Sequence, residues 1–186
     1  MIERNQAQEG DDKGLSPDHP ANKARGCFFA AFEIFLYEPR GVILGQYKQD
    51  SCVAACCRML LADQGIELPE SDIRAVLEVD GGAYISTLPE ALRLCGLTIT
   101  YQYRNDLTID DLRLALQRGP AVAFVARPRE KAGHALLIEK ITERRVCLRD
   151  PLPELEGKAY QVALIDFLPL WIHSHNGRGQ AAIVLE

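Results

Sequence analysis

The chain has 186 residues, of which 47% are hydrophobic and 25% are charged, and its formal net charge at pH 7 is −5. This length suits one domain with a substantial core, and the composition is ordinary for a globular protein. The chain is acidic and no stripe of Lys and Arg stands out, so nucleic acid is not an expected partner.

The N-terminal part divides into a polar stretch and an apolar one. Residues 1–25 contain Gly, Pro and Asp and few apolar side chains, which predicts a flexible arm ahead of a domain spanning residues 26–186. The segment Cys27–Tyr37 (CFFAAFEIFLY) is interrupted by Glu33 and is shorter than the roughly 18 to 20 apolar residues that span a bilayer. It also starts too late for a signal peptide. We therefore predict a buried helix or strand here, no membrane span, and a cytoplasmic protein unless a specialised route exports it.

The first half of the chain beyond this segment has the pattern of helices. Residues 51–64 (SCVAACCRMLLADQ) have helical periodicity, with Asp50 or Ser51 as the N-cap and Gly65 as a left-handed end. The remaining predictions are a helix after Pro69, a helix from about Thr87 to Cys95 with Gly96 as its stop, a strand at Leu97–Tyr103, and a helix from Thr108 to Gly119–Pro120.

The second half has the pattern of short strands separated by turns. The predicted strands are residues 121–126, 134–141, 145–149, 159–164 and 180–185. Helices followed by strands indicate an α+β fold rather than alternating βαβ units. We expect a helical lobe packed on an antiparallel sheet, with a site in the cleft between them.

The six cysteines do not have the pattern of disulfides or a metal site. No signal peptide supports an oxidising compartment, and Cys56 and Cys57 are adjacent, which is poor geometry for a set of bridges. No CxxC pair occurs, and no histidine lies near at zinc-finger spacing. We predict neither a metal nor another cofactor, and most of the thiols are expected to be small buried hydrophobes.

Cys52 is the exception, because it falls in the first turn of the predicted helix 51–64. Unpaired backbone N–H groups and the helix dipole favour a thiolate there. A nucleophilic cysteine needs this bias, since its usual pKa of about 8.5 leaves little thiolate at neutral pH. Cys56 and Cys57 lie deeper in the helix and are expected to pack in the core. Taken alone, Cys52 would more often be a core residue than a nucleophile.

Two further residues supply the rest of a nucleophilic site. His134 opens the strand 134–141 beside a polar loop, a common position for a catalytic base. Asp150 ends the strand RVCLRD, from which it can approach His134 and hold the second ring nitrogen. By themselves a strand-end histidine and an Asp-Pro pair are usually a surface residue and a turn. The weaker histidine candidates are His19, His173 and His175.

Four segments together resemble a known family. They are Gln46–Cys56 (QYKQDSCVAAC), Gly133–Ile138 (GHALLI), Arg149–Pro151 (RDP) and Asp166–Trp171 (DFLPLW). They are similar to the opening motif, the histidine strand, the Asp-Pro element and the Phe and Trp segment of papain-like peptidase domains that remove double-glycine leaders. Those domains lie at the N-termini of bacteriocin-exporting ABC transporters. The resemblance covers about Gly41 to the C-terminus.

The resemblance implies a papain-like cysteine peptidase fold and a role for each site residue. Cys52 corresponds to the nucleophile, His134 to the base and Asp150 to the group that orients the base. Gln46, six residues before the cysteine, corresponds to an oxyanion-hole donor. The implied substrate is an extended peptide or protein with small residues such as Gly-Gly at the cleavage point, as in bacteriocin processing.

The sequence also departs from the family. Ser51 and Val53 stand where members usually have Asp and Gly, which bears on substrate preference more than on the existence of a site. No GxxxxGK[ST] motif and no membrane span are present, so we expect a stand-alone peptidase and not a complete exporter.

Three functions follow from these residues. The preferred one is a cysteine peptidase that hydrolyses peptide bonds through a Cys-His-Asp triad. The second is a papain-like toxin or effector module of a bacterial competition system, acting as a protease, deamidase or acyltransferase, with a transporter, delivery or immunity partner. The third is a catalytically silent peptide-binding domain, which the joint presence of Gln46, Cys52, His134 and Asp150 argues against, because binding alone needs no such set.

Overall fold

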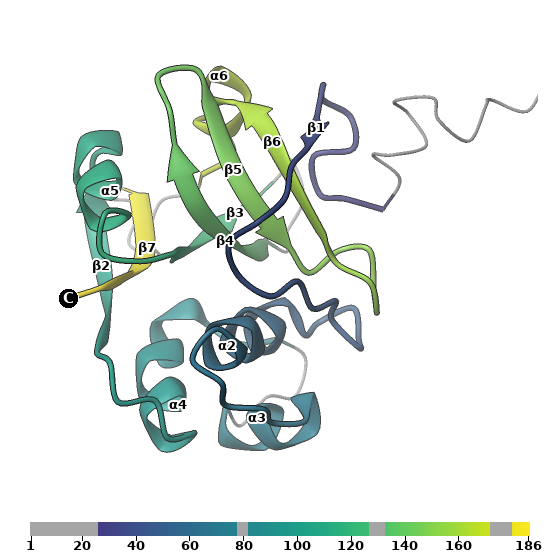
Figure 1. Ribbon diagram of the computed structural model, residues 1–186, viewed down its shortest axis with the longest axis vertical. Coiled ribbons are helices and arrows are strands. Elements are labelled where there is room, and N and C mark those ends of the chain that lie inside the picture. The colour runs from purple at the N-terminus through teal and green to yellow at the C-terminus, as the bar shows by residue number, and fades with distance from the viewer. Residues whose placement is uncertain (1–25, 78–81, 127–132, 172–179) are drawn as a thin grey trace, which may run out of the picture.

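The computed structural model describes residues 26–77, 82–126, 133–171 and 180–186. Within these ranges, a lobe of helices packs against one face of an antiparallel seven-stranded sheet (Figure 1). The α+β architecture predicted from the change of pattern along the chain is therefore confirmed. The predicted arm, residues 1–25, and the histidines His19, His173 and His175 lie outside the described residues.

The helical lobe is built around α2 (Cys52–Ala62), which lies between the sheet and the other helices (Figure 1). The other members are α3 (Glu70–Val76), the short 3₁₀ helix η1 (Ile85–Thr87) and α4 (Leu88–Leu94). Eight of the 11 residues of α2 are buried, because the helix is covered by the sheet on one side and by the other helices on the other. Gly65 follows α2 with a φ of 74°, the left-handed conformation predicted for it, and Gly96, the predicted stop of α4, has a φ of 93°.

The sheet has the strand order β1-β6-β5-β4-β3-β7-β2. Its strands are β1 (Phe35–Leu36), β2 (Tyr101–Leu107), β3 (Ala121–Val125), β4 (His134–Ile141), β5 (Arg145–Asp150), β6 (Lys158–Ala163) and β7 (Gln180–Leu185). Helices α5 (Ile109–Ala115) and α6 (Leu164–Phe167) pack at its margins. No helix of the described ranges combines the length and the apolar character needed to cross a bilayer.

Two elements differ from the sequence prediction by more than two residues at a boundary. The strand predicted at Leu97–Tyr103 is instead β2, because its ladder with β7 begins only at the pair Tyr101–Leu185. Before Tyr101, the carbonyl of Thr100 accepts from the backbone N–H of Glu186 at 3.0 Å, but the residues from Leu97 onward form no continuous ladder. The helix predicted to reach Gly119–Pro120 ends as α5 at Ala115 and continues as a turn, although Thr108 caps it through a capping box with Asp111 as its partner.

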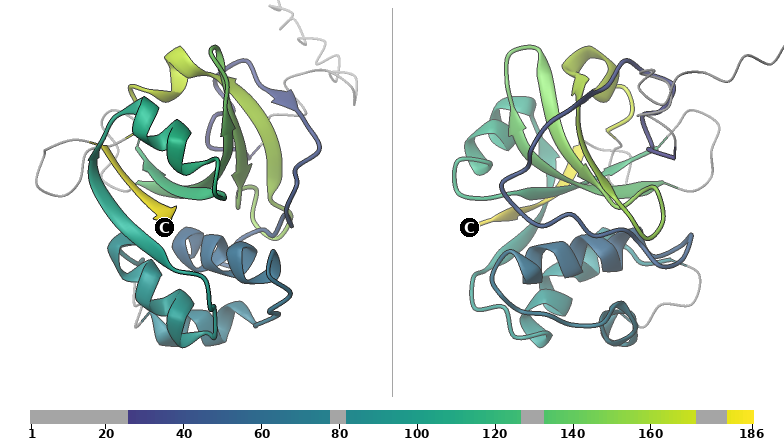
Figure 2. Two further views of the ribbon diagram at one scale, coloured as in Figure 1. Left: turned by 60° about the vertical axis from the view of Figure 1, so that its left-hand side comes forward. Right: turned by 45° about the vertical axis from the view of Figure 1, so that its right-hand side comes forward.

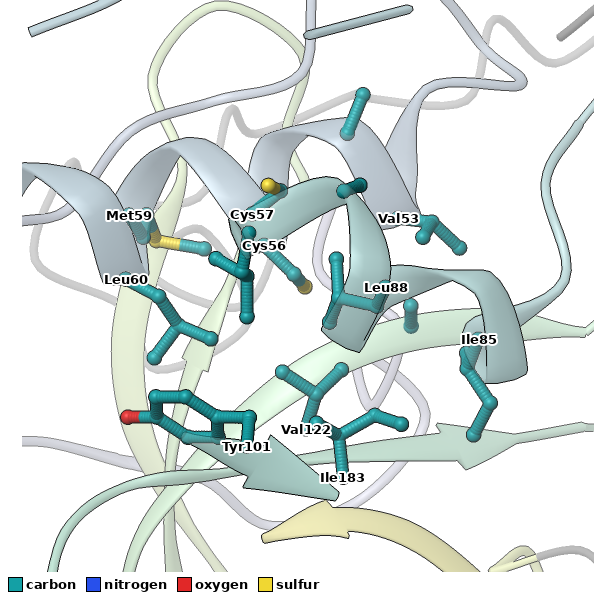
Figure 3. Packing of buried hydrophobic residues seen from close by; sticks show 14 of the residues in the cluster. Val53, Cys56, Cys57, Met59, Leu60, Ile85, Leu88, Tyr101, Val122 and Ile183 are labelled. Atoms are coloured by element: carbon teal, nitrogen blue, oxygen red, sulfur yellow. The ribbon is translucent and has the colours of Figure 1, made fainter. Parts of the chain in front are cut away.

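The sheet carries an apolar core on each face. The first core lies between the helices and the sheet, where Val53, Leu88 and Val122 pack together (Figure 3). The second covers the opposite face and is rich in aromatic rings, including those of Phe167 and Trp171. Successive residues of a strand point to opposite faces, so the strands of the sheet contribute to both cores.

The segment Cys27–Tyr37 was predicted to be a buried helix or strand, and this prediction is wrong for most of it. Only Phe35–Leu36 form a strand, paired with β6 and exposed to solvent. Cys27, Phe28 and Phe29 form turns, and all three are buried in the second core. Three consecutive side chains cannot all point to one face of a strand, so turns replace it. Figure 2 shows the segment running along the β6 edge of the sheet before the chain enters α2.

Candidate active site

The three predicted catalytic residues lie at the ends of three elements that meet. Cys52 is the first residue of α2, His134 is the first of β4, and Asp150 is the last of β5. Strands β4 and β5 are antiparallel neighbours, so the start of one lies beside the end of the other. The His134 Nε2 atom lies 2.6 Å from Asp150 Oδ1, the contact that the two strand ends predicted.

The Asp150 carboxylate is fully buried and has four donors around it. Oδ1 accepts from His134 and from the backbone N–H of Leu152 at 2.9 Å. Oδ2 accepts from the backbone N–H of Phe28 at 2.9 Å and from the hydroxyl of Tyr160. A buried charge is costly unless its lone pairs are satisfied, and these donors supply that compensation.

His134 is almost fully buried, and its environment favours the charged imidazolium. Burial by itself lowers the pKa of His134, but the charge and hydrogen bond of Asp150, followed by the interactions with Cys52, outweigh it. The net effect raises the pKa of His134 from 6.5 to about 9. Because Nε2 faces Asp150, the other ring nitrogen, Nδ1, is left for the sulfur of Cys52.

Cys52 has the complementary shift. Burial raises the pKa of its thiol, but the hydrogen bond and charge of His134 and the backbone N–H groups of Ala135 and Val53 act the other way, and the net pKa lies below its usual value. Its position at the N-terminus of α2 adds the unpaired N–H groups of a first helical turn. The two opposed shifts favour a thiolate on Cys52 and an imidazolium on His134.

The other five cysteines lack this environment. All six thiols are free. Burial raises the pKa of Cys56 and Cys57, as expected for packing residues, and burial with the nearby Asp150 charge raises that of Cys27 to about 12. The pKa values of Cys95 and Cys147 are also raised by burial. Cys52 is therefore the one cysteine of the six whose thiol is biased towards the thiolate.

Two side chains of α3 form hydrogen bonds to the loop that precedes Cys52. The carboxylate of Glu70 accepts from the backbone N–H of Tyr47 at 3.0 Å. The guanidinium of Arg74 donates to Asp50 at 3.0 Å and to the hydroxyl of Ser51. Ser51 stands at the predicted N-cap of α2, but neither predicted residue caps the helix by its side chain, because Arg74 occupies both of them. These two α3 residues thus fix the approach to Cys52.

Gln46, the predicted oxyanion donor, is buried in this loop. Its amide Nε2 donates to the carbonyl oxygens of Lys48 at 2.8 Å and Gln49 at 3.1 Å. Its Oε1 is buried and has no hydrogen-bond partner within the described part of the chain. Both amide hydrogens are therefore engaged by loop carbonyls, and the role of Gln46 in catalysis stays a prediction.

Sequence reasoning missed the residues that support Asp150. Tyr160 lies in β6, and Phe28 lies more than a hundred positions before Asp150 in a segment outside the family resemblance. Neither has a spacing relative to Cys52, His134 or Asp150 that marks it in the sequence. Only the pairing of β5 with β6, and the packing of the N-terminal turns under the sheet, bring them to the carboxylate.

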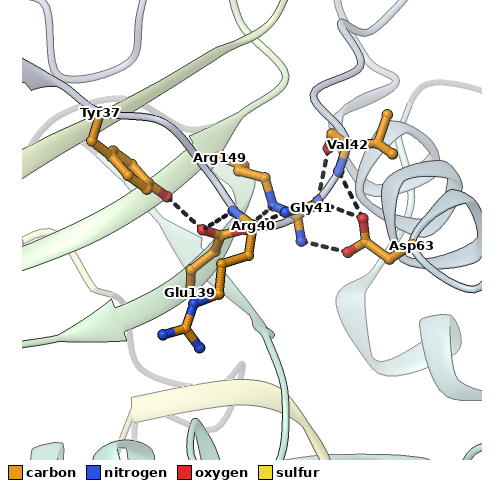
Figure 4. Close-up of polar contacts among 7 residues, drawn as sticks. All are labelled: Tyr37, Arg40, Gly41, Val42, Asp63, Glu139 and Arg149. Carbon is orange, nitrogen blue, oxygen red and sulfur yellow. Dashed lines mark hydrogen bonds and ion pairs between the residues drawn. The ribbon is translucent and has the colours of Figure 1, made fainter.

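A second buried charge cluster lies at the other end of α2 (Figure 4). Arg149 donates to Asp63 at 2.6 Å and to the carbonyl of Val42 at 2.7 Å, and its Nε lies 2.8 Å from Glu139. A pocket of about 560 Å³ lies beside it, lined also by Arg40, Leu116, Arg118 and Pro120. The rise of the 11-residue helix α2 places Asp63 about 15 Å from Cys52, and the side chain of Arg149 is directed to Asp63 and Glu139, not to the candidate active site.

The helical lobe packed on an antiparallel sheet is the fold of a papain-like cysteine peptidase. A sequence profile of the Peptidase C39 family matches residues 41–172, most of the chain. The chain belongs to the Peptidase C39 family, a family of cysteine peptidases. No curated protein sequence matches the chain significantly.

Solved structures show the same fold at low sequence identity. A C39-like peptidase from Bacillus anthracis is similar with a TM-score of 0.60 and 16% identity, over 80% of this chain and 98% of that one. The peptidase domain of Streptococcus ComA, a bifunctional ABC transporter involved in quorum sensing, gives 0.57 and 15%, over 77% and 96%. A double-glycine-motif protease from an AMS/PCAT transporter, in complex with the leader peptide, gives 0.55 and 14%, over 78% and 91%.

Proposed function

We propose that this chain hydrolyses peptide bonds with Cys52 as the nucleophile, His134 as the general acid and base, and Asp150 as the group that orients His134. The observation that carries the proposal is the geometry: Cys52 opens α2, and the Nε2 atom of His134 lies 2.6 Å from Asp150 Oδ1. The contact with His134 lowers the pKa of Cys52, and Asp150 followed by Cys52 raises that of His134. Such a pair supplies an attacking thiolate and a proton donor at neutral pH.

The proposed reaction uses the charged pair in two steps. The Cys52 thiolate attacks the peptide carbonyl, and the resulting oxyanion is held by the Cys52 backbone N–H and the Gln46 amide. The amide would exchange one of its loop carbonyls for the oxyanion as the substrate binds. The His134 imidazolium protonates the leaving amine, and the neutral ring then takes a proton from the water that hydrolyses the thioester.

The proposed substrate is an extended peptide cleaved after small residues such as Gly-Gly. The support is the resemblance to double-glycine leader peptidases, together with a structural neighbour that is a double-glycine-motif protease solved with its leader peptide. Glycine has no side chain to obstruct passage through a narrow cleft. Val53 follows Cys52 but is 1% exposed and packs in the first core, so it adds no support to this preference.

The thiolate is tested by alkylation with iodoacetamide followed by mass mapping across pH 5 to 9. Cys95 is the matched control, because it and Cys52 are the two cysteines that are not fully buried and Cys95 has a raised pKa. We expect Cys52 to react selectively near neutral pH and to lose that reactivity in His134→Ala. Equal labelling of Cys52 and Cys95 would remove the basis for the proposed catalysis.

The reaction is tested with peptides that differ only in a Gly-Gly or a Val-Val pair at one position. We expect cleavage after Gly-Gly by the wild type and by Cys95→Ala, and none by Cys52→Ala. A deamidated or acyl-transferred product in place of two fragments would instead support an effector activity. Peptide binding without any product from wild-type protein would support a binding domain.

A further inference from the structure

The segment before the family-matched region makes direct contact with two residues of the proposed active site, His134 and Asp150. The match to the Peptidase C39 family begins at residue 41, whereas residues 26–34 already pack against the sheet face that carries His134 and Asp150. These residues are called here the N-terminal segment. Their contacts fall on the two groups whose orientation decides whether Cys52 becomes a thiolate.

Phe29 anchors the N-terminal segment in the second core. It is fully buried, and its ring packs on those of Tyr160 and Phe167 at centroid distances of 6.3 and 6.2 Å. At the start of the segment, Gly26 has a φ of 82° and lies so close to Pro153 that an added Cβ would come within 2.7 Å of that side chain. The segment is therefore held at both sides of Phe28.

Phe28 contacts His134 with its ring and Asp150 with its backbone N–H. Its ring stacks on the imidazole of His134 with a centroid distance of 5.3 Å and an interplanar angle of 12°. Its backbone N–H donates to Asp150 Oδ2 at 2.9 Å, beside the hydroxyl of Tyr160, which donates to the same atom. One residue thus fixes the plane of the imidazole and one oxygen of the carboxylate that orients it.

These contacts matter because the strength of the His134–Asp150 hydrogen bond depends on the orientation of the imidazole and on the exclusion of water. A flat ring against one face of the imidazole restricts rotation about its side-chain bonds and keeps water from the bond. An ion pair shielded from water is stronger than one in solvent, since the effective dielectric is lower. The side chain that shields this bond is 4% exposed.

We propose that Phe28 is a positioning residue of the active site, so that the N-terminal segment is a working part of the catalytic centre as well as a packing element. The inference rests on the proposed function of Cys52 and His134. Loss of the ring lets the imidazole rotate and admits water to its hydrogen bond with Asp150. The raised pKa of His134 and the lowered pKa of Cys52 then both move back towards their ordinary values. The thiolate fraction at neutral pH then falls.

The test compares Phe28→Leu with Phe29→Leu in the full chain. Both variants remove a buried ring from the same segment, but only the first removes the stack on His134. We expect the pH midpoint of Cys52 alkylation to rise by about one unit in Phe28→Leu, with about a tenfold loss of rate near neutral pH. On a cleavable peptide, kcat falls and KM stays unchanged. Phe29→Leu lowers stability and leaves the midpoint in place.

A conservative variant and a second observable keep the test decisive. Phe28→Tyr retains the flat ring and should restore the wild-type midpoint, and Phe28→Met replaces Phe28→Leu if the latter does not fold. In the Cys52→Ala background, the proton between His134 and Asp150 should give a sharp low-field NMR signal that broadens when Phe28 is replaced by Leu, through exchange with water.

The outcomes separate this inference from the proposed function. If wild-type Cys52 reacts no faster than Cys95, the proposed catalysis itself fails. If wild-type Cys52 is fast but Phe28→Leu and Phe29→Leu share one midpoint and one kcat, catalysis stands and the positioning role is overturned. If the midpoint moves in Phe28→Leu alone and returns in Phe28→Tyr, the positioning role is supported.

Discussion

Two neighbouring residues of β5 carry buried charges to opposite faces of the sheet. Arg149 points to the helical lobe, where Asp63 and Glu139 surround it (Figure 4). Asp150 points to the aromatic core on the other face, where it binds His134 and Tyr160. The two side chains are 1% and 0% exposed. Burial and ion pairing alone therefore do not separate a structural charge from one proposed to act in catalysis.

The difference lies in what the partners can do. An arginine stays protonated at any working pH, so the cluster at Arg149 holds fixed charges that join α2 to the sheet. The partner of Asp150 is an imidazole whose second nitrogen is left for Cys52, and both of those groups exchange protons. A buried charge becomes catalytic when it orients a titratable group that still has a reacting neighbour.

Asp150→Asn should have the largest effect. The amide keeps the size of the carboxylate but removes the charge that favours the imidazolium and fixes its tautomer, so kcat should fall by about 10² to 10⁴. Asp63→Asn is the matched control, because it removes a carboxylate from the Arg149 cluster. The kcat values are corrected for the folded fraction. An equal loss of kcat in Asp63→Asn would show that the Asp150 site and the Arg149 cluster affect catalysis in the same way.

Arg149→Met should chiefly affect stability. It leaves the partly buried carboxylates of Asp63 and Glu139 without their partner, and the free energy of unfolding should fall by about 3 to 5 kcal/mol. Urea denaturation measures the change. Arg93→Met is the control, since its ion pair with Glu90 is exposed and its loss should not be resolved. Similar curves for the two variants would show that the Arg149 cluster contributes little.

The pKa of His134 should separate the effect of Asp150 from that of burial. In Cys52→Ala, we expect an NMR titration of the ring above 6.5, because Asp150 remains. In Cys52→Ala with Asp150→Asn, burial dominates and the pKa should fall below 6.5. A pKa above 6.5 in the double variant would show that another group charges the ring.

The same titration has a consequence for stability. Because the pKa of His134 is higher in the folded than in the unfolded state, its protonation stabilises the folded state. This stabilisation is fully present below the unfolded-state pKa of 6.5 and is lost as the pH rises through the folded-state pKa. The stability of Cys52→Ala should therefore decline above pH 6.5 through this group. Unfolding curves recorded along that pH series measure it, and the Asp150→Asn background should lack the decline.

Arg74→Met should have the smallest effect. Its ion pair with Asp50 is partly exposed, so the loss should stay within about 1 kcal/mol at pH 7. Arg74 lowers the pKa of Asp50, so the contribution is present above the unfolded value of 3.8 and is lost as the pH falls further. Denaturation at pH 7 and pH 3 measures it, and a difference that grows in acid would contradict this account.

The sequence determined the local elements and selected the candidate site residues. Helical periodicity and Gly65 located α2, and the capping residue Thr108 located α5. Alternating and apolar runs located β4 and β5, so that His134 and Asp150 were placed at neighbouring strand ends. These features follow from short-range propensities and from burial on one side of an element, which a linear pattern records.

Tertiary structure decided what those residues touch. Strand β2 begins at Tyr101 because its pairing with β7 begins there. The hydroxyl of Ser51 accepts a hydrogen bond from Arg74 instead of capping α2. Tertiary structure also placed Phe28 on His134 and on Asp150, a contact between residues 122 positions apart. Such contacts depend on which distant segment fills the space beside a buried group, and no periodicity within a single segment contains that information.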